Sequence, residues 1–256
     1  IHAALLEPTK FAECYVGGGP INSKTGKPFG SETKKFAAWA EEQAAAGLIA
    51  LPRGDFEYYA DLNRAVQAHP IAGRLLSGVK REVSVQWRHP ETGLLLCCRP
   101  DGVAFAERAS VVVADVKSCK SAGAGPQQFG ASAYKYGYLF QLAMYNDGVR
   151  ATTEREVEQT IILALEKEPP YAIAHYRVDE YQLAMGRDHV TDALRQLVLC
   201  QRFNDWPGYP EGVEDLILPG YAGTEWTPFA DGLEQVLIQR AKRAGRELPP
   251  APPVED

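Results

Sequence analysis

Two aspartates and a lysine near the middle of the chain have the residue types and spacing that metal-dependent phosphodiester chemistry requires. Asp101 follows Arg99-Pro100, and Asp115 stands two residues before Lys117 at the end of a valine-rich run. Hard cations such as Mg²⁺ prefer carboxylate oxygens, and they activate water and neutralise phosphate charge. We therefore expect Asp101, Asp115 and Lys117 to be catalytic, with an ion shared by the two carboxylates.

The strands expected around these residues would bring them together. One strand is predicted over 94–98, leading into Asp101, and a second over 111–116, buried on both faces. Neighbouring antiparallel strands lie about 4.8 Å apart, so the two carboxylates can meet. Lys117 shares a strand face with Asp115, whereas Val116 points into the core and offers its backbone carbonyl to the ion.

The alternative interpretation is an ion pair on a solvated strand edge, with Pro-Asp-Gly as a simple turn. An isolated Asp-x-Lys is usually of that kind. The upstream Pro-Asp at hairpin spacing and the valine run favour the catalytic interpretation in this sequence.

A helix predicted over 131–146, after a loop over 118–130, adds groups that can hold a substrate. Gln141 and Tyr145 are four residues apart and so share a helix face, which Tyr134 and Tyr138 extend. This face can hold phosphate oxygens or a terminal nucleotide. The alternative is that the tyrosines belong to the core and only their hydroxyls reach water.

The other elements alternate in a way that indicates one α/β domain on a mixed sheet. Helical periodicity covers 2–14, 31–46, 56–68, 180–203 and 230–244, with a short turn at 71–76. Strand patterns cover 81–88, 159–165 and 172–178. We expect the main domain to span residues 1–210 and a partly irregular C-terminal extension to span 211–256.

Composition excludes several classes of protein. The 256 residues are 45% hydrophobic and 23% charged, as in a soluble globular protein. No apolar run reaches the roughly 20 residues that a membrane-spanning helix needs. The five cysteines have no C-x-x-C spacing, which argues against zinc, iron–sulfur or disulfide frameworks and favours a reducing cytoplasm. The first residue is isoleucine and no secretory signal follows, so we expect a piece of a longer protein.

The formal net charge of −6 is unevenly distributed. Residues 151–256 hold 10 Lys and Arg against 19 Asp and Glu, a net charge of −9, whereas residues 1–150 carry +3. Binding to a polyanion depends on local charge, so the chain can accommodate DNA near its catalytic motif.

The three motifs together resemble the PD-(D/E)XK nuclease superfamily. Within it, the similarity is closest to the RecE-type exonucleases (exodeoxyribonuclease VIII) and to RecB-like nuclease domains. The matching segments are Ile1–Pro8, Arg81–Val85, Glu91–Leu94, Arg99–Asp101, Ala114–Lys117, Gln141–Tyr145 and Trp206–Tyr209. The resemblance implies a restriction-endonuclease-like core, in which helices flank a central mixed β-sheet.

The resemblance also implies a set of metal ligands. His2 corresponds to a histidine that binds metal beside Asp101 and Asp115; without the resemblance, a helical histidine would be interpreted as structural. Glu82 corresponds to an acidic residue on the strand before the motif, facing the substrate or a second ion. The alternative for Glu82 is a solvated strand glutamate.

The activity implied is that of a Mg²⁺- or Mn²⁺-dependent exodeoxyribonuclease with one or two ions and no iron–sulfur cluster. Lys117 would be the catalytic lysine, and Gln141 and Tyr145 would contact the substrate. Such relatives degrade double-stranded DNA ends in the 5′→3′ direction for recombination and repair. They form ring-shaped trimers or tetramers, and a single-strand annealing protein takes up the exposed 3′ strand. The setting would be the cytoplasm of a bacterial or phage-infected cell, with no membrane association.

Two alternatives stay open: a structure-specific endonuclease, and a non-catalytic DNA-binding or assembly module with a nuclease fold. Because every motif position is filled, the sequence favours an enzyme.

Overall fold

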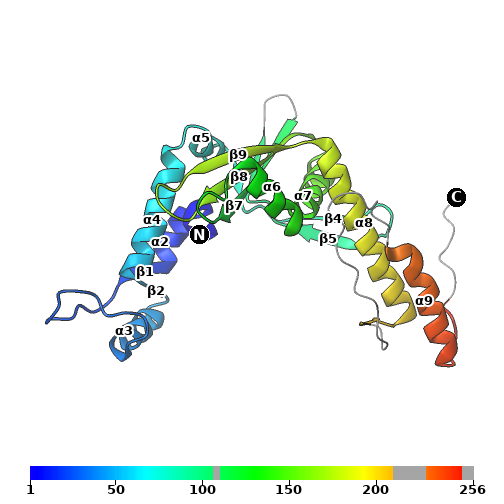
Figure 1. The fold of residues 1–256 in the computed structure, drawn as a ribbon, viewed down its shortest axis with the longest axis horizontal. Helices are drawn as coiled ribbons and strands as arrows, with labels where there is room; N and C mark the ends of the chain where they lie inside the picture. The colour runs from blue at the N-terminus through cyan, green and yellow to red at the C-terminus, as the bar shows by residue number, and fades with distance from the viewer. Residues whose placement is uncertain (106–109, 210–228, 250–256) are drawn as a thin grey trace.

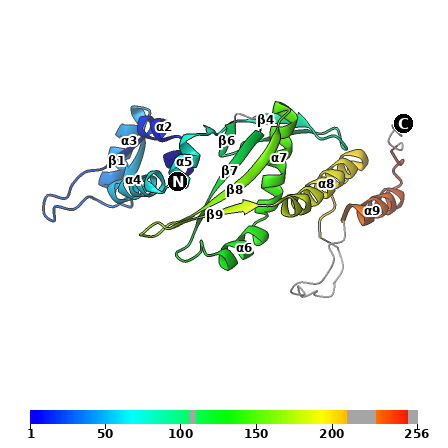
Figure 2. The same ribbon diagram turned by 90° about the horizontal axis from the view of Figure 1, so that it is seen from above.

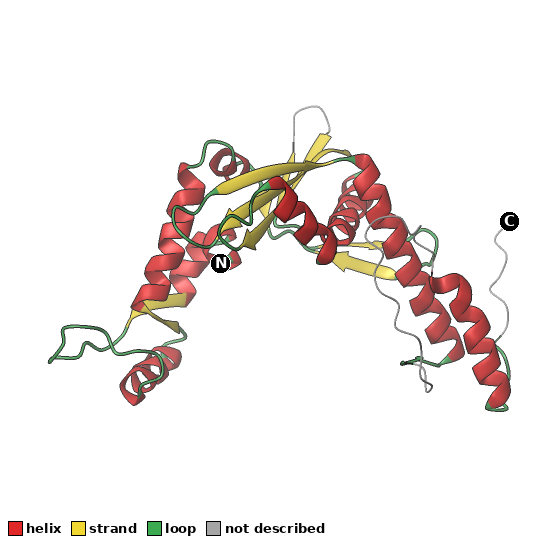
Figure 3. Cartoon of the chain, in the orientation of Figure 1, coloured by secondary structure: helices red, strands yellow, loops and turns green. Residues whose placement is uncertain are grey.

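The computed structural model describes residues 1–105, 110–209 and 229–249, and it has the outline of an arch. A sheet forms the crown, and the N-terminal helices and the last two helices extend from its two sides (Figure 1). Both arms are mainly helical, with one small pair of strands in the N-terminal arm (Figure 3). No helix among the described residues is long and apolar enough to cross a membrane.

The crown is a five-stranded sheet in the order β3-β6-β7-β8-β9, with β7 in the centre (Figure 2). Its strands are β3 (Lys80–Arg81), β6 (Gly102–Phe105), β7 (Ser110–Cys119), β8 (Glu156–Glu166) and β9 (Ile173–Val178). β7 runs parallel to β8, whereas the β3–β6, β6–β7 and β8–β9 pairs are antiparallel. The predicted α/β fold with a central mixed sheet flanked by helices is confirmed.

Helices cover both faces of this sheet and create two cores. The covering helices are α6 (Pro126–Lys135), α7 (Tyr138–Thr153) and α8 (Glu180–Phe203) on one face, and α1 (His2–Leu6), α4 (Arg53–Ala68) and α5 (Ala72–Ser77) on the other. Val111 and Val113 of β7 pack in the first core, and Val116 packs in the second. Because side chains alternate along a strand, Asp115 and Lys117 lie on the α7 side.

A strand predicted over 81–88 is interrupted in the structure. β3 ends at Arg81, Glu82 has a φ of 53°, and β4 (Val85–Arg88) then pairs with β5 (Leu95–Cys98) in a separate two-stranded sheet. A left-handed backbone is unusual for a non-glycine residue and breaks the extended ladder. The alternating pattern was correct for β4 but could not show this break.

The position of Asp101 also differs from the prediction. We expected it at the end of the strand over 94–98, but it lies just before β6, an unpredicted strand of four residues. Gly102 pairs with Ala114, so Asp101 still lies near Asp115. The Pro-Asp-Gly sequence is typical of a turn, which concealed the short strand that follows.

The helix predicted over 2–14 is divided at Glu7, where φ is −127° and ψ is 57°. α2 (Pro8–Cys14) starts at proline, which has no N–H group and whose ring disfavours helical backbone in the preceding residue. The break makes α1 a separate element that packs on the sheet.

The helix predicted over 131–146 is likewise two helices. α6 begins at Pro126, inside the segment predicted as a loop, and Gly137 with a φ of 66° separates it from α7. Proline is favoured in the first turn of a helix, and glycine readily adopts the left-handed backbone conformation at a position between two helices. Gln141 and Tyr145 both lie on α7, as their spacing required.

In the N-terminal arm, β1 (Tyr15–Gly18) and β2 (Ile49–Pro52) form a parallel pair that the sequence did not reveal. α3 (Lys34–Ala45) lies between them in sequence and corresponds to the helix predicted over 31–46.

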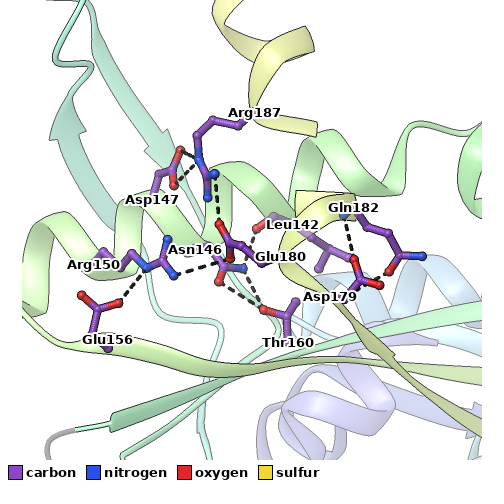
Figure 4. Close-up of polar contacts among 10 residues, drawn as sticks. All are labelled: Leu142, Asn146, Asp147, Arg150, Glu156, Thr160, Asp179, Glu180, Gln182 and Arg187. Carbon is purple, nitrogen blue, oxygen red and sulfur yellow. Dashed lines mark hydrogen bonds and ion pairs between the residues drawn. The ribbon is translucent and has the colours of Figure 1, made fainter. Parts of the chain in front are cut away.

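A polar network fixes α7 against β8 and α8 (Figure 4). The buried side chains of Asn146 and Thr160 exchange hydrogen bonds of 2.9 and 3.1 Å. Arg187 of α8 contacts both carboxylate oxygens of Asp147 at 3.1 and 3.2 Å. Gly186 allows α8 to approach α7 closely, because a Cβ at this position would lie 2.3 Å from the carbonyl oxygen of Leu139. The helix that carries Gln141 and Tyr145 is therefore rigidly held.

The helix predicted over 180–203 matches α8, which begins with a capping box between Asp179 and Gln182. α9 (Phe229–Arg243) matches the helix predicted over 230–244 and packs on α8 through Leu233 and Leu237. Residues 211–228 and 250–256 of the predicted C-terminal extension lie outside the described residues, and the division at residue 210 stays a prediction.

Candidate active site

Asp101 and Asp115 come together where β6 begins beside β7. Asp101 is 4% exposed and Asp115 is fully buried. The Oδ2 atom of Asp101 accepts a hydrogen bond of 2.7 Å from the backbone N–H of Val116. This bond ties Asp101 to the strand that carries Asp115 and leaves Oδ1 free of it.

His2 reaches this aspartate from α1. Its Nδ1 atom lies 3.5 Å from Oδ1 of Asp101, and its side chain is half exposed. Hydrogen bonding to Asp101 raises the pKa of His2, against the opposing effect of burial. The structure thus brings together His2 and Asp101, which are ninety-nine positions apart in the sequence numbering.

Glu82 is the third member of this group. Ligand atoms of His2, Glu82 and Asp101 all lie within 4.8 Å of one another, and within the described parts of the chain this is the one such group of three that could hold a metal ion. Burial raises the pKa of Glu82, although Arg99 forms an ion pair with it at 2.5 Å. The geometry therefore groups Glu82 with the potential metal ligands.

Lys117 connects Asp115 to α7. Its Nζ atom lies 3.0 and 2.8 Å from the two carboxylate oxygens of Asp115 and donates a 2.7 Å hydrogen bond to Oε1 of Gln141. Gln141 in turn donates from Nε2 to the hydroxyl of Tyr145 at 2.6 Å. The ammonium group also lies 4.9 Å from the ring centroid of Tyr138. A continuous polar chain thus runs from the carboxylate to the tyrosine.

Burial dominates the electrostatics of this chain. It raises the pKa of the Asp115 carboxyl, while the positive charge of Lys117 acts in the opposite direction. Burial also raises the pKa of Tyr145 well above its ordinary value, so this hydroxyl is neutral at physiological pH. A neutral tyrosine can donate a hydrogen bond to an anionic oxygen.

The donor set suits a hard divalent cation. The group of His2, Glu82 and Asp101 offers carboxylate oxygens, which Mg²⁺ and Mn²⁺ prefer, and one imidazole nitrogen, a ligand more typical of transition metals. The buried Oδ2 atom of Asp115 has no hydrogen-bond partner within the described structure, although the Lys117 ammonium is near. The N–H of Val116 binds Asp101, and the Val116 side chain packs in the opposite core. The role of the Val116 carbonyl as a metal ligand stays a prediction.

Arg81, next to Glu82, makes contacts that the sequence did not reveal. Its guanidinium donates to the carbonyl of Leu76 at 3.0 and 2.7 Å and to that of Leu6 at 3.2 Å. It therefore links the end of α1 and the end of α5 to β3, next to Glu82. The sequence signal was an arginine directly before the acidic residue, but its backbone partners could not be identified.

The mixed sheet places Asp101, directly before β6, next to Asp115 and Lys117 of β7, an arrangement that fits the PD-(D/E)XK class of folds. The profile of the family described as "PDDEXK-like domain of unknown function (DUF3799)" matches residues 1–218. The chain belongs to this family.

Two solved structures are similar to parts of the chain. One, from Eubacterium rectale, is described as a candidate exonuclease; it has 14% identity and a TM-score of 0.47, over 70% of this chain and 71% of that one. The other, SSO0001, has 17% identity and a TM-score of 0.31, over 54% and 58% of the two chains. No curated protein sequence matches this chain significantly.

Proposed function

We propose that this protein is a divalent-metal-dependent DNA exonuclease. The observation that carries the proposal is the position of Lys117, which lies between the buried Asp115 carboxylate and Gln141, beside the group formed by His2, Glu82 and Asp101. A cluster of potential metal ligands next to a lysine and two substrate-binding side chains suits phosphodiester hydrolysis.

The residues of the site would have separate roles in binding metal and orienting water. His2, Asp101 and Asp115 would hold Mg²⁺ or Mn²⁺, with Glu82 as a further ligand for the same or a second ion. When bound, such an ion lowers the pKa of water and stabilises negative charge on a phosphate. The Lys117 ammonium would orient the attacking water, and its contacts with Asp115 and Gln141 fix its direction.

Gln141 and Tyr145 would hold the substrate. The hydroxyl of Tyr145 accepts a hydrogen bond from Gln141, and its own proton can point to a phosphate oxygen. Both residues lie on α7, which the network around Asn146 and Arg187 holds against the sheet. Such rigid positioning lowers the entropic cost of aligning the substrate.

Beyond the class of reaction, the motifs that resemble RecE-type exonucleases support a more specific proposal. The substrate would be a double-stranded DNA end, degraded 5′→3′ to leave a 3′ single strand for recombination. A ring-shaped trimer or tetramer and a single-strand annealing partner would follow from the same resemblance, as would a cytoplasmic location in a bacterial or phage-infected cell.

The decisive experiment is digestion of linear duplex DNA labelled at the 5′ or the 3′ end, with Mg²⁺, with Mn²⁺ and with EDTA. Metal-dependent release that starts with the 5′ label is expected, and Asp115→Ala and Lys117→Ala should abolish it. Covalently closed circular DNA is the matched control, because an exonuclease leaves it intact while an endonuclease nicks it. Absence of cleavage with every divalent metal, despite retained DNA binding, would favour a non-catalytic module.

A further inference from the structure

A cavity of about 810 Å³ lies beside the proposed catalytic lysine. Its lining includes Ser118, directly after Lys117, and Tyr138. The ring centroid of Tyr138 is 4.9 Å from the Lys117 ammonium, so this tyrosine borders both the cavity and the lysine. We call it the α6 pocket; its main lining residues are Ser118, Lys120, Gln128, Tyr136, Tyr138 and Lys167. This volume is within the range of about 300–1,000 Å³ typical of ligand sites, so the pocket can admit more than a phosphate ion.

The charges of the α6 pocket suit an anion. Lys120 and Lys167 are both exposed, and within the described residues neither forms an ion pair with a carboxylate. The nearby Glu166 is buried, and its carboxylate accepts a hydrogen bond of 3.3 Å from the backbone N–H of Ala124. The two ammonium groups are therefore available to a ligand that carries phosphates.

The aromatic residues of the pocket suit a base. The rings of Tyr136 and Tyr138 are stacked, with centroids 6.1 Å apart and an interplanar angle of 27°. Tyr136 is 63% exposed. Nucleic-acid bases stack on exposed aromatic rings regardless of sequence, and neighbouring lysines then bind the backbone phosphates.

The backbone holds the wall of the pocket in place. Ala124, which follows the lining residue Gly123, is fixed through its N–H by Glu166 and through its carbonyl by the hydroxyl of Tyr176. The backbone N–H of Lys167 donates to the carbonyl of Cys119 at 3.1 Å, so β7 and β8 stay joined beyond their ends. The segments that carry Lys120 and Lys167 are thus ordered before a ligand arrives, which lowers the cost of binding.

We propose that the α6 pocket binds a single-stranded segment of the substrate next to the scissile phosphate. Lys120 and Lys167 contact its backbone phosphates, and Tyr136 stacks on a base. Tyr138 lies between this segment and Lys117. The inference rests on the proposed nuclease function, and it extends the substrate contacts from Gln141 and Tyr145 to this pocket.

A binding assay tests the pocket without requiring cleavage. The affinity of a short fluorescent single-stranded oligonucleotide is measured by anisotropy in EDTA, between about 50 and 200 mM salt. The pocket variant is Lys120→Ala with Lys167→Ala. The matched control is Lys242→Ala with Arg243→Ala on α9, which removes the same charge from exposed positions in the far arm (Figure 1).

Loss of two phosphate contacts should lower the slope of log affinity against log salt by about 1.4 in the pocket variant. Its loss of affinity relative to wild type should therefore be about 7-fold larger at 50 mM than at 200 mM salt, whereas the control should bind like wild type. Tyr136→Ala should weaken binding about 5- to 150-fold, and Tyr136→Phe, which keeps the ring, should not. Circular dichroism verifies that each variant is folded.

Equal affinities and salt slopes for the pocket variant and the control would overturn the inference, and so would equal binding by Tyr136→Ala and wild type. The two proposals fail differently. If the protein cleaves DNA with metal but binding does not depend on the pocket, the pocket inference is wrong and the nuclease proposal is supported. If binding depends on the pocket but no metal supports cleavage, the nuclease proposal is wrong and the pocket is a single-strand binding site.

Discussion

Replacement of Lys117 by methionine would leave a buried carboxylate without its cation. Asp115 is fully buried, and the Lys117 side chain is 13% exposed, with Nζ 2.8 and 3.0 Å from the carboxylate oxygens. Removal of one partner from a buried ion pair costs about 3–5 kcal/mol. Because Lys117 keeps some contact with water, we expect the lower end, about 3 kcal/mol. A domain stable by about 5–15 kcal/mol would still fold.

The assay is urea unfolding in EDTA of four proteins: wild type, Lys117→Met, Asp115→Asn and the double variant. If the unpaired charge causes the loss, the double variant should regain most of it and exceed Lys117→Met in unfolding free energy by roughly 2 kcal/mol. All three variants should lack nuclease activity, so stability and catalysis are separated within one set of proteins.

Two results would refute this reasoning. Equal unfolding free energies for wild type and Lys117→Met would show that the carboxylate does not depend on the lysine. A double variant less stable than Lys117→Met would show that the cost comes from lost packing and not from an unpaired charge.

Three other changes test the metal group and the scaffold. Saturating Mn²⁺, at about 100 times Kd, should stabilise the wild type by about 2.7 kcal/mol, and Asp101→Asn should remove this stabilisation in thermal melts. Arg81→Met should lower the unfolding free energy by roughly 2 kcal/mol through lost charge-assisted hydrogen bonds, and weaken Mn²⁺ binding in calorimetry. Gly186→Ala should cost about 1–3 kcal/mol in urea unfolding, because its Cβ meets the Leu139 carbonyl. The control Gly130→Ala, with open space around it, should not lower stability.

The sequence predicted well those parts of the site that depend on local periodicity. Asp115 and Lys117 share a face because strand side chains alternate, and Gln141 and Tyr145 share a face because they are one helical turn apart. Their hydrogen-bonded chain follows directly from these two periods once α7 packs on β7. The roles of these residues stay predictions until cleavage is measured.

The parts that could not be predicted depend on backbone breaks and distant contacts. Glu82 lies beside Asp101 because β3 pairs with β6: Arg81 stands opposite Gly102, and the N–H of Glu82 donates to the carbonyl of Asp101 at 3.2 Å. An alternating pattern reveals neither this pairing nor the left-handed residue, with a φ of 53°, at which β3 ends. Likewise, Arg81 acts on the carbonyls of Leu6 and Leu76, which sequence spacing cannot connect. Such positions are determined by tertiary packing.

The site has two sides that meet at Asp101 and Asp115. His2 and Glu82 approach Asp101 on one side, and Lys117 and α7 approach Asp115 on the other. The hydrogen bond from Val116 N–H to Asp101 joins the two sides through the backbone of β7. Any shift of β6 relative to β7 would therefore change both the distance between the two aspartates and the distance from Asp101 to Lys117. The short strand β6, absent from the predicted elements, therefore sets the position of Asp101 relative to Asp115 and Lys117.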